Sequence, residues 1–357
     1  MLEKRGQFYS FRYPYVYYFF LGKYFAENLS DIEIRDRVSR YSQHLYVRDY
    51  ANTIVFLAHH SRDSFVYEQI VAVLKGLFSD KSELDFCGDT KSLAALVESA
   101  PRLVLAGGDV IEHRREVRAM QDEITEGSGR VETGDNDTEA EGETLPLFSK
   151  LTLLFKTVEI LGQILKNQYA TIPNNEKARL LEHAFSGPLR ALKDFFEVVG
   201  TDTDMIVGEV ERFIAEHESN ISEEKRAKIA RDAVFLMIVA ISFGSLYKTA
   251  SSVGSEHLRE TISAVADKND TVAFRLIELC VKLESQGGIP FSLITALKKR
   301  TKDNSFAYHI LQRMAYHYLY MFKTKESDKQ RLCAELGIPM ATQRVIDLKT
   351  RDSKRDK

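Results

Sequence analysis

A run of aromatic residues near the amino terminus constrains this chain more than any other feature. It begins Phe8-Tyr9-Ser10-Phe11-Arg12-Tyr13 and continues, after Pro14, to Leu29. Alternation predicts a strand before Pro14, and a proline is well placed in the first turn of a helix, because the N–H that it lacks would have no partner there. Apolar residues wrap most of the helix expected over 14–28. The sequence therefore predicts that this helix is buried against another part of a protein.

The remaining sequence favours helices. The chain has 357 residues with 7 prolines and no tryptophan, and 44% of it is hydrophobic, which is enough for more than one core. Apolar residues recur at helical spacing in successive segments joined by short connections. We expect an all-α fold, an irregular array of helical hairpins that forms an α-solenoid or an orthogonal bundle. A short β-hairpin over 2–13, turning at Gly6, would precede it.

One segment divides the chain. Between Gln121 and Thr144 the acids far outnumber the single base, Arg130, and little apolar content follows Val131. Such a segment buries too little surface to offset the entropy of ordering, so it is expected to be disordered. The expected regions are a winged-helix remnant (1–29), a first helical region (30–125), an acidic linker (126–144), a second helical region (145–350) and a disordered tail (351–357).

Local patterns make four further predictions. Gly162 interrupts a helical run at a cost of about 1 kcal/mol relative to alanine, so another helix should approach closely there. Gly187-Pro188 should break a helix that starts near Glu176. Asn304 should cap the helix that follows it. The uncharged segment 233–247 is shorter than the roughly 20 residues of a membrane span, so we interpret it as a buried core helix.

The patterns of common catalytic sites are absent from the sequence. The closest approach to a phosphate-binding loop, Gly244 to Thr249, has Tyr247 where the second glycine is needed. No HExxH pair, CxxC pair or Gly-x-Ser-x-Gly elbow occurs. The apolar run before Asp109 resembles a strand leading to a metal-binding acid, but an extended connector is the simpler interpretation. We expect a protein that is not an enzyme and that uses no cofactor and no metal.

Nucleic acid is an alternative ligand at one segment. Lys298, Lys299 and Arg300 belong to a basic run that ends at Lys302, and tyrosines 308, 316, 318 and 320 follow. Bases on phosphates and stacking aromatics would suit nucleic acid. The competing interpretation is a helix end whose dipole favours cations, followed by a core helix. The net charge of -3 gives no global attraction to nucleic acid.

The expected location is the cytoplasm. The start of the chain has no apolar signal segment, and the cysteines, at positions 87, 280 and 333, are far apart and odd in number. We interpret them as reduced thiols.

At residues 6–29 the sequence resembles the end of the winged-helix domain in bacterial STAND-type NTPases, the NACHT and NB-ARC relatives. The similarity rests on Gly6 to Tyr13, on Tyr17-Tyr18-Phe19 and on Lys23-Tyr24-Phe25-Ala26, which match a wing strand followed by an aromatic docking helix. Segments 54–63 and 156–167 are similar to arm helices of the same family. The family's nucleotide-binding domain, with its Walker residues, is not in this sequence.

The resemblance implies a non-catalytic interaction or sensor arm of a STAND-like NTPase, with a role in anti-phage defence. Its partner would be a missing or separately encoded NTPase core, or a second copy of itself. The alternatives are a stand-alone helical scaffold and a nucleic-acid-binding protein that uses 298–302. The residues expected to make contacts are Phe11, Tyr13, Tyr17, Tyr18, Phe19, Tyr24, Phe25, Lys298, Lys299 and Arg300.

Overall fold

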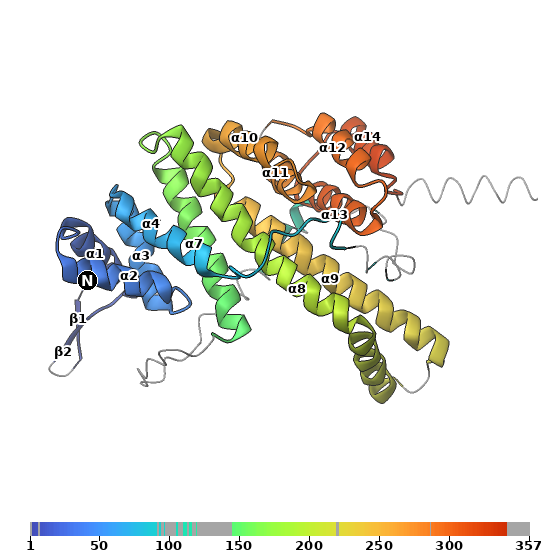
Figure 1. Ribbon diagram of the computed structural model, residues 1–357, viewed down its shortest axis with the longest axis horizontal. Coiled ribbons are helices and arrows are strands. Elements are labelled where there is room, and N and C mark those ends of the chain that lie inside the picture. Colours follow the sequence, from blue (N-terminus) through green and yellow to red (C-terminus); the bar gives the residue numbers. More distant parts are fainter. Residues whose placement is uncertain are drawn as a thin grey trace, which may run out of the picture. The chain divides into compact units, whose positions relative to one another are not determined.

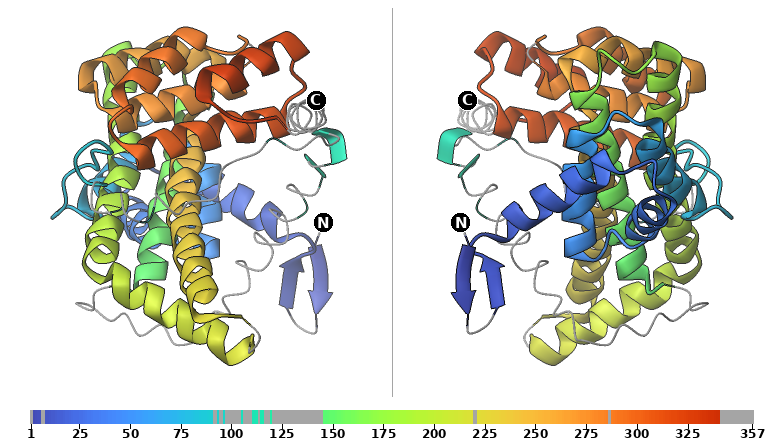
Figure 2. Two further views of the ribbon diagram at one scale, coloured as in Figure 1. Left: turned by 90° about the vertical axis from the view of Figure 1, so that its right-hand side faces the viewer. Right: turned by 90° about the vertical axis from the view of Figure 1, so that its left-hand side faces the viewer.

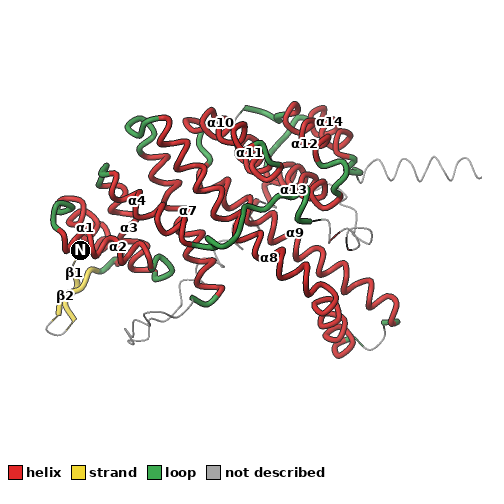
Figure 3. The backbone as a smooth tube through the Cα atoms, in the orientation of Figure 1, coloured by secondary structure: helices red, strands yellow, loops and turns green. Residues whose placement is uncertain are grey.

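The computed structural model describes residues 2–5, 8–90, 93, 96, 105, 110–112, 114–115, 119, 145–218, 221–285 and 287–340. Helices make up most of these residues, which confirms the all-α class (Figures 1 and 3). The acidic linker over 126–144 and the tail over 351–357 lie outside the described residues. So does the connector expected before Asp109, apart from Leu105.

The chain begins with a short hairpin that leads into a helix (Figure 2). Strand β1 (Leu2–Arg5) pairs antiparallel with β2 (Phe8–Phe11), and Leu2 lies opposite Phe11. Helix α1 (Pro14–Glu27) follows, with its proline in the first turn as expected. Next come α2 (Ile32–Gln43), α3 (Arg48–His60) and α4 (Ser64–Gly76).

The later elements are all helical. Their bounds are α7 (Leu147–Asn167), α8 (Asn174–His217), α9 (Glu223–Val253), the 3-10 turn η2 (Glu256–Leu258), α10 (Arg259–Asn269), α11 (Val272–Glu284), α12 (Phe291–Arg300), α13 (Ser305–Met321) and α14 (Glu326–Leu336).

Two compact units make up the fold, and neither is a continuous stretch of chain. Unit 1 comprises Met1–Leu84, Asp137–Asp194 and Tyr247–Asp270, and unit 2 comprises Asp85–Asn136, Phe195–Leu246 and Thr271–Lys357. This differs from the consecutive helical regions expected at 30–125 and 145–350. The reason is that α8 and α9 are long, so that each helix has one end in unit 1 and the other end in unit 2.

Unit 1 is organised around α3, which packs against α1, α2, α4 and α7. Ile54 and Leu57 of α3 are completely buried, as are Leu154 and Leu161 of α7. Burial of such side chains is the main source of stability in a helical fold. Helix α3 is thus the centre of the interior of unit 1, and α1 covers one side of it.

Unit 2 has an aromatic core at the start of α13. Phe306 contacts Phe86, Phe196 and Phe235, with ring centroids 5.5 to 6.3 Å apart. Asn304 caps α13 as predicted, since its Oδ1 accepts the N–H of Ala307 at 2.8 Å. The Asn304 side-chain amide also donates to the Phe86 carbonyl at 2.5 Å. One residue therefore both starts the helix and holds the 86–90 segment against it.

The expected break at Gly187-Pro188 is wrong. Helix α8 continues through both residues and departs from helical geometry at Asp202, where φ is -112° and ψ is 15°. A proline in a helix costs about 3 kcal/mol. Burial of its neighbours Phe185 and Leu189, which are completely enclosed, offsets that cost. A β-carbon at Gly187 would lie 3.2 Å from Leu154, so glycine allows close packing at this point.

Candidate functional site

Helix α1 has a buried face and an exposed face, and both are rich in aromatic residues. The buried side consists of Val16, Tyr18, Gly22 and Phe25. The large residues with more than a third of their surface exposed are Tyr13, Tyr15, Tyr17, Phe19, Phe20 and Tyr24, and Tyr15 is the most open at 60%. Contiguous exposed apolar surface on a folded protein commonly marks an interaction site. We call these six residues the α1 aromatic surface.

The aromatic residues that the sequence predicted to make contacts fall into an exposed group and a buried group. Tyr13, Tyr17, Phe19 and Tyr24 are on the α1 aromatic surface. By contrast, Tyr18 and Phe25 lie in the interior of unit 1, and Phe25 retains only 1% exposure. Their position follows from the period of the helix, which places residues three, four and seven apart on one side.

Phe11 adds to the α1 aromatic surface from β2. It is half-buried, and its ring lies 6.1 Å from that of Phe20 and 6.4 Å from that of Tyr17. Tyr15 and Phe20 were not among the predicted contact residues. The sequence pattern could not identify them, because in a helix that is apolar all round it does not show which side another helix covers.

A glycine sets the distance between α1 and α3. A β-carbon at Gly22 would lie 2.7 Å from the Leu57 backbone nitrogen and 2.8 Å from the Phe56 β-carbon. Side chains essentially never approach so closely, so only glycine allows this crossing. Close contact at Gly22 holds α1 firmly on its inner side, and the α1 aromatic surface is therefore presented by a fixed helix.

Tyr18 anchors the first half of α1 to α3. Its hydroxyl donates a hydrogen bond to the Asp49 carboxylate. Burial, and then this bond, raise the pKa of the Tyr18 phenol to about 12. The phenol therefore stays neutral, and it supplies a polar contact in an otherwise apolar crossing.

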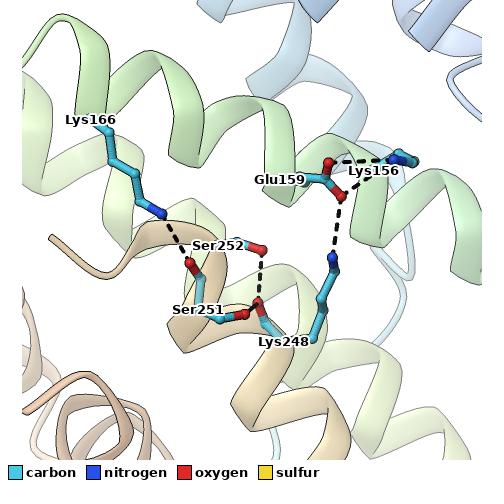
Figure 4. A network of polar contacts seen from close by, with 6 residues as sticks. All are labelled: Lys156, Glu159, Lys166, Lys248, Ser251 and Ser252. Atoms are coloured by element: carbon cyan, nitrogen blue, oxygen red, sulfur yellow. Dashed lines mark hydrogen bonds and ion pairs between the residues drawn. The ribbon is translucent and has the colours of Figure 1, made fainter. Parts of the chain in front are cut away.

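A second close crossing, between α7 and α9, has charged residues around it (Figure 4). Glu159 on α7 accepts hydrogen bonds from Lys248 on α9 at 3.2 Å and from Lys156 at 3.4 Å. Burial alone would raise the pKa of Glu159, but the two lysines outweigh it and hold that pKa below its usual value. This cluster is an ion-paired support between two helices.

The same crossing completes the end of α9. Lys166 Nζ donates to the Ser251 carbonyl at 2.9 Å, and Ser252 Oγ donates to the Lys248 carbonyl at 2.7 Å (Figure 4). The last four carbonyls of a helix lack N–H partners within it, so the Lys166 cation stabilises the Ser251 carbonyl. A β-carbon at Gly162 would lie only 2.1 Å from the Ser252 carbonyl oxygen. The predicted close approach at Gly162 is confirmed.

The basic segment is placed in the last turn of α12, which contains Lys298, Lys299 and Arg300. Lys298 Nζ donates to the Glu335 carbonyl at 2.6 Å and pairs with the Glu335 carboxylate at 3.7 Å. Lys299 and Arg300 are exposed. The segment therefore provides an exposed pair of cations and one cation that binds α14.

The tyrosines that follow this segment contact other parts of unit 2. Tyr308 donates its hydroxyl to the Leu336 carbonyl at 2.8 Å. The ring of Tyr316 lies 4.6 Å from that of Tyr320, and Tyr318 stacks on Phe322 at 5.2 Å. All of these tyrosines are half-buried. They form part of the packing on α13.

Among the described residues, no group of three or more histidine, cysteine, aspartate or glutamate side chains could hold a metal ion. Three of the described histidines contact neighbouring side chains. His60 lies against Phe19 with ring centroids 4.7 Å apart, and His309 lies against Phe235 at 5.0 Å. His59 Nδ1 is 3.1 Å from the Asn167 amide nitrogen.

Helix α9 is long and apolar enough to cross a membrane, judged by length and composition alone. Its most apolar window has a mean hydropathy of 1.8, and 44% of that window is buried inside the protein. A core helix of a protein without membrane spans has the same features, so α9 is weak evidence for a membrane. Leu236, Met237 and Ile241 are its exposed large side chains within the uncharged segment.

Comparison with protein-family models, with curated proteins and with solved structures found no match to this chain.

Proposed function

We propose that this protein is a non-catalytic interaction arm that docks on a protein partner through the α1 aromatic surface. The observation that carries the proposal is that Tyr13, Tyr17, Phe20 and Tyr24 are exposed on a helix whose other side is locked to α3. Tyrosine and phenylalanine are favoured in interfaces, because they bury a large area at a low cost in conformational entropy. A rigid helix face also loses little entropy on binding.

The resemblance to STAND-type NTPases supports an NTPase core as the proposed partner. In this proposal the β1–β2 hairpin is the wing of a winged-helix module, and α1 is its docking helix. A two-stranded hairpin alone is only marginally stable in water, so contacts with a partner would stabilise it. Because α1 packs mainly on α3, which is not the next helix along the chain, we propose that unit 1 is an orthogonal bundle rather than a regular solenoid.

The DNA next to the Met1 codon gives the first test. We expect a coding region with a phosphate-binding loop, either in frame or in an adjacent gene. Absence of such a region would contradict an NTPase partner. It would then favour a stand-alone helical scaffold.

Direct binding gives the second test. The encoded NTPase core, purified and labelled, is titrated with the full chain and with the double variant Phe20→Ser/Tyr24→Ser. We expect the variant to bind at least tenfold more weakly, as is usual when central aromatic contacts are removed. The matched control is Phe148→Ser, because Phe148 is an exposed phenylalanine at the start of α7. Equal binding by the Phe20/Tyr24 variant and the control would overturn the proposal.

A further inference from the structure

Helices α8 and α9 run antiparallel as a long hairpin, and residues 195–217 of α8 and 223–246 of α9 belong to unit 2 (Figure 1). This part of α9 has exposed apolar residues spaced three, four and seven apart, so they form one stripe along the helix. They are Ile229, Ala233, Leu236, Met237, Ala240 and Ile241, which we call the α9 apolar stripe. No charged residue occurs between Ala233 and Tyr247 to interrupt it.

The opposite side of α9 already attaches the helix to unit 2. Phe235 and Ile238 are completely buried. The ring of Phe235 lies 6.1 Å from that of Phe306 and 5.0 Å from that of His309, both on α13. The α9 apolar stripe is therefore a second apolar side of a helix that is held without it. Exposed apolar surface of this kind commonly marks an interaction site.

The exposed side of α8 in unit 2 combines apolar and acidic residues. Its exposed large apolar side chains are Val198 at 56%, Met205 at 62% and Phe213 at 62%. Its exposed acids include Asp204, Glu209 and Glu216. Glu209 also forms an ion pair with Arg212, one turn along the same helix. Acids outnumber bases on this side of α8.

The first turns of α9 have the opposite charge. Glu223 and Glu224 begin the helix, and the exposed bases Lys225, Lys228 and Arg231 follow. Exposed bases thus lie where the α9 apolar stripe starts.

Contacts within one hairpin show which residues of the two helices lie at the same level. Glu211 Oε1 of α8 is 3.7 Å from Arg226 Nε of α9. Because the helices are antiparallel, Glu209 is level with Lys228, and Gly208 with Ile229. Phe196 and Phe235 both contact Phe306, so Val198 lies near the level of Leu236.

We propose that two copies of this chain pair through these hairpins, with α8 of one copy along α9 of the other in a four-helix bundle. The twofold axis is parallel to the helices, so rotation about it leaves every residue at its own level. Glu209 of each copy then faces Lys228 of the other. Val198 and Met205 of each copy cover the α9 apolar stripe of the other.

Gly208 supports this pairing independently. A β-carbon at Gly208 would have no atom within 4 Å, and glycine inside a helix lowers stability relative to alanine. Gly22 and Gly162, by contrast, allow helices of the same chain to cross closely. In the proposed dimer Gly208 is level with Ile229 of the other copy, and its missing side chain leaves room for that residue.

Complementarity of the hairpin to itself favours a second copy over a lipid surface. An interface about a twofold axis needs one patch that complements itself, and the hairpin does so in both charge and apolar content. Helix α9 is apolar enough for a membrane, but the acids of α8 beside it would be repelled by anionic lipid headgroups. The dimer uses no residue of α1, so the inference goes beyond the proposed function and does not rest on it.

Sedimentation of the full chain at increasing protein concentration tests the inference. We expect a dimer to form as the concentration rises. The double variant Leu236→Glu/Ala240→Glu should dimerise at least tenfold more weakly, because it places charges in the apolar centre of the contact. The matched control is Ile32→Glu at the start of α2, where isoleucine is 74% exposed. The control should dimerise like the unchanged chain.

Two charge variants test the pairing of α8 with α9 of the other copy. Glu209→Lys alone and Lys228→Glu alone each bring like charges together, and each should weaken dimerisation about tenfold. An equal mixture of the two variants should recover a mixed dimer, because opposite charges then face each other at both contacts. Contacts within one chain cannot produce this recovery, so its absence would overturn the proposal even if another variant failed to fold.

Three further outcomes would also overturn it. The first is an unchanged chain that stays monomeric at every concentration. The second is loss of the dimer in Phe20→Ser/Tyr24→Ser but not in Leu236→Glu/Ala240→Glu, which would place the contact between copies on the α1 aromatic surface. The third is binding of the monomer to phosphatidylcholine vesicles that Leu236→Glu/Ala240→Glu abolishes, which would assign the α9 apolar stripe to lipid. Binding of the NTPase core should be unchanged in Leu236→Glu/Ala240→Glu, so the two proposals can fail separately.

Discussion

Two helix crossings in unit 1 are both made possible by glycine, yet their surroundings differ. At Gly162, α7 meets the end of α9, and the neighbouring residues Leu161 and Leu165 are completely buried. At Gly22, α1 meets α3, but the side of α1 away from α3 carries exposed aromatic rings. Helix α7 is thus covered by other parts of the same chain, whereas α1 is covered on one side.

The comparison shows how to separate packing from function in a helix that is apolar all round. The α7–α9 crossing adds ion pairs and carbonyl contacts through Glu159 and Lys166. The α1–α3 crossing has a neutral donor instead, the Tyr18 hydroxyl that bonds to Asp49. Apolar residues with partners inside the unit stabilise the fold. The exposed rings of Tyr17, Phe20 and Tyr24 retain open surface with which to stabilise a complex.

The largest effect should come from Gly162→Ala. The new β-carbon would overlap the Ser252 carbonyl oxygen, and both atoms belong to rigid helix backbones. We expect the free energy of unfolding to fall by about 3 kcal/mol, at the upper end for overpacking. Urea denaturation measures it. Gly244→Ala on α9 is the control, because open space surrounds Gly244 and alanine should stabilise the helix there by about 0.5–1 kcal/mol.

Gly22→Ala should have a smaller effect, of about 1–3 kcal/mol. The overlap with Leu57 and Phe56 is less severe than at Gly162, and the open side of α1 allows the helix to shift outward. Hydrogen exchange should show faster exchange in α1 than in α7. Equal protection of the two helices in this variant would contradict the idea that α1 is held on one side.

Opposite pH dependences should distinguish the crossings. The pKa of Glu159 is lower in the folded protein than its ordinary value of 4.5, so its contribution is present above that value and lost as the pH falls. The pKa of Tyr18 is raised from 10.0 to about 12, so its contribution is present below 10.0 and lost as the pH rises toward 12. The measurement is the urea midpoint as a function of pH. The fall in stability at acid pH should be smaller in Glu159→Gln, and the fall at alkaline pH should be smaller in Tyr18→Phe. If the loss of stability at acid or alkaline pH is unchanged in the matching variant, a group other than Glu159 or Tyr18 causes that loss.

The smallest effect on stability should come from Phe20→Ser/Tyr24→Ser. Both side chains are exposed, and surface substitutions usually change stability by about 0.5 kcal/mol or less. The same variant should bind less of a hydrophobic fluorescent dye than the unchanged chain does. A loss of stability similar to that of Gly22→Ala would show that these rings support the fold rather than an interface.

Much of the local structure was predictable, because it depends on residues close together in the sequence. Pro14 begins α1, Asn304 caps α13, and Gly162 marks a close crossing. The candidate site was predictable only in part. Helical period groups Tyr18 with Phe25 and Tyr17 with Tyr24, but the sequence does not show which of the two groups α3 covers.

The sequence by itself determined the helical class, the cap at Asn304 and the close approach at Gly162, since propensity, capping and glycine's lack of a side chain act over a few residues. The tertiary structure alone decided that α8 continues through Pro188, that each unit joins three separate segments, and that Tyr41 of α2 stacks on Tyr50 of α3. These features depend on burial between residues far apart in the chain. Burial of large apolar side chains outweighs local costs such as that of a proline, so which faces stay open is decided only when the helices pack.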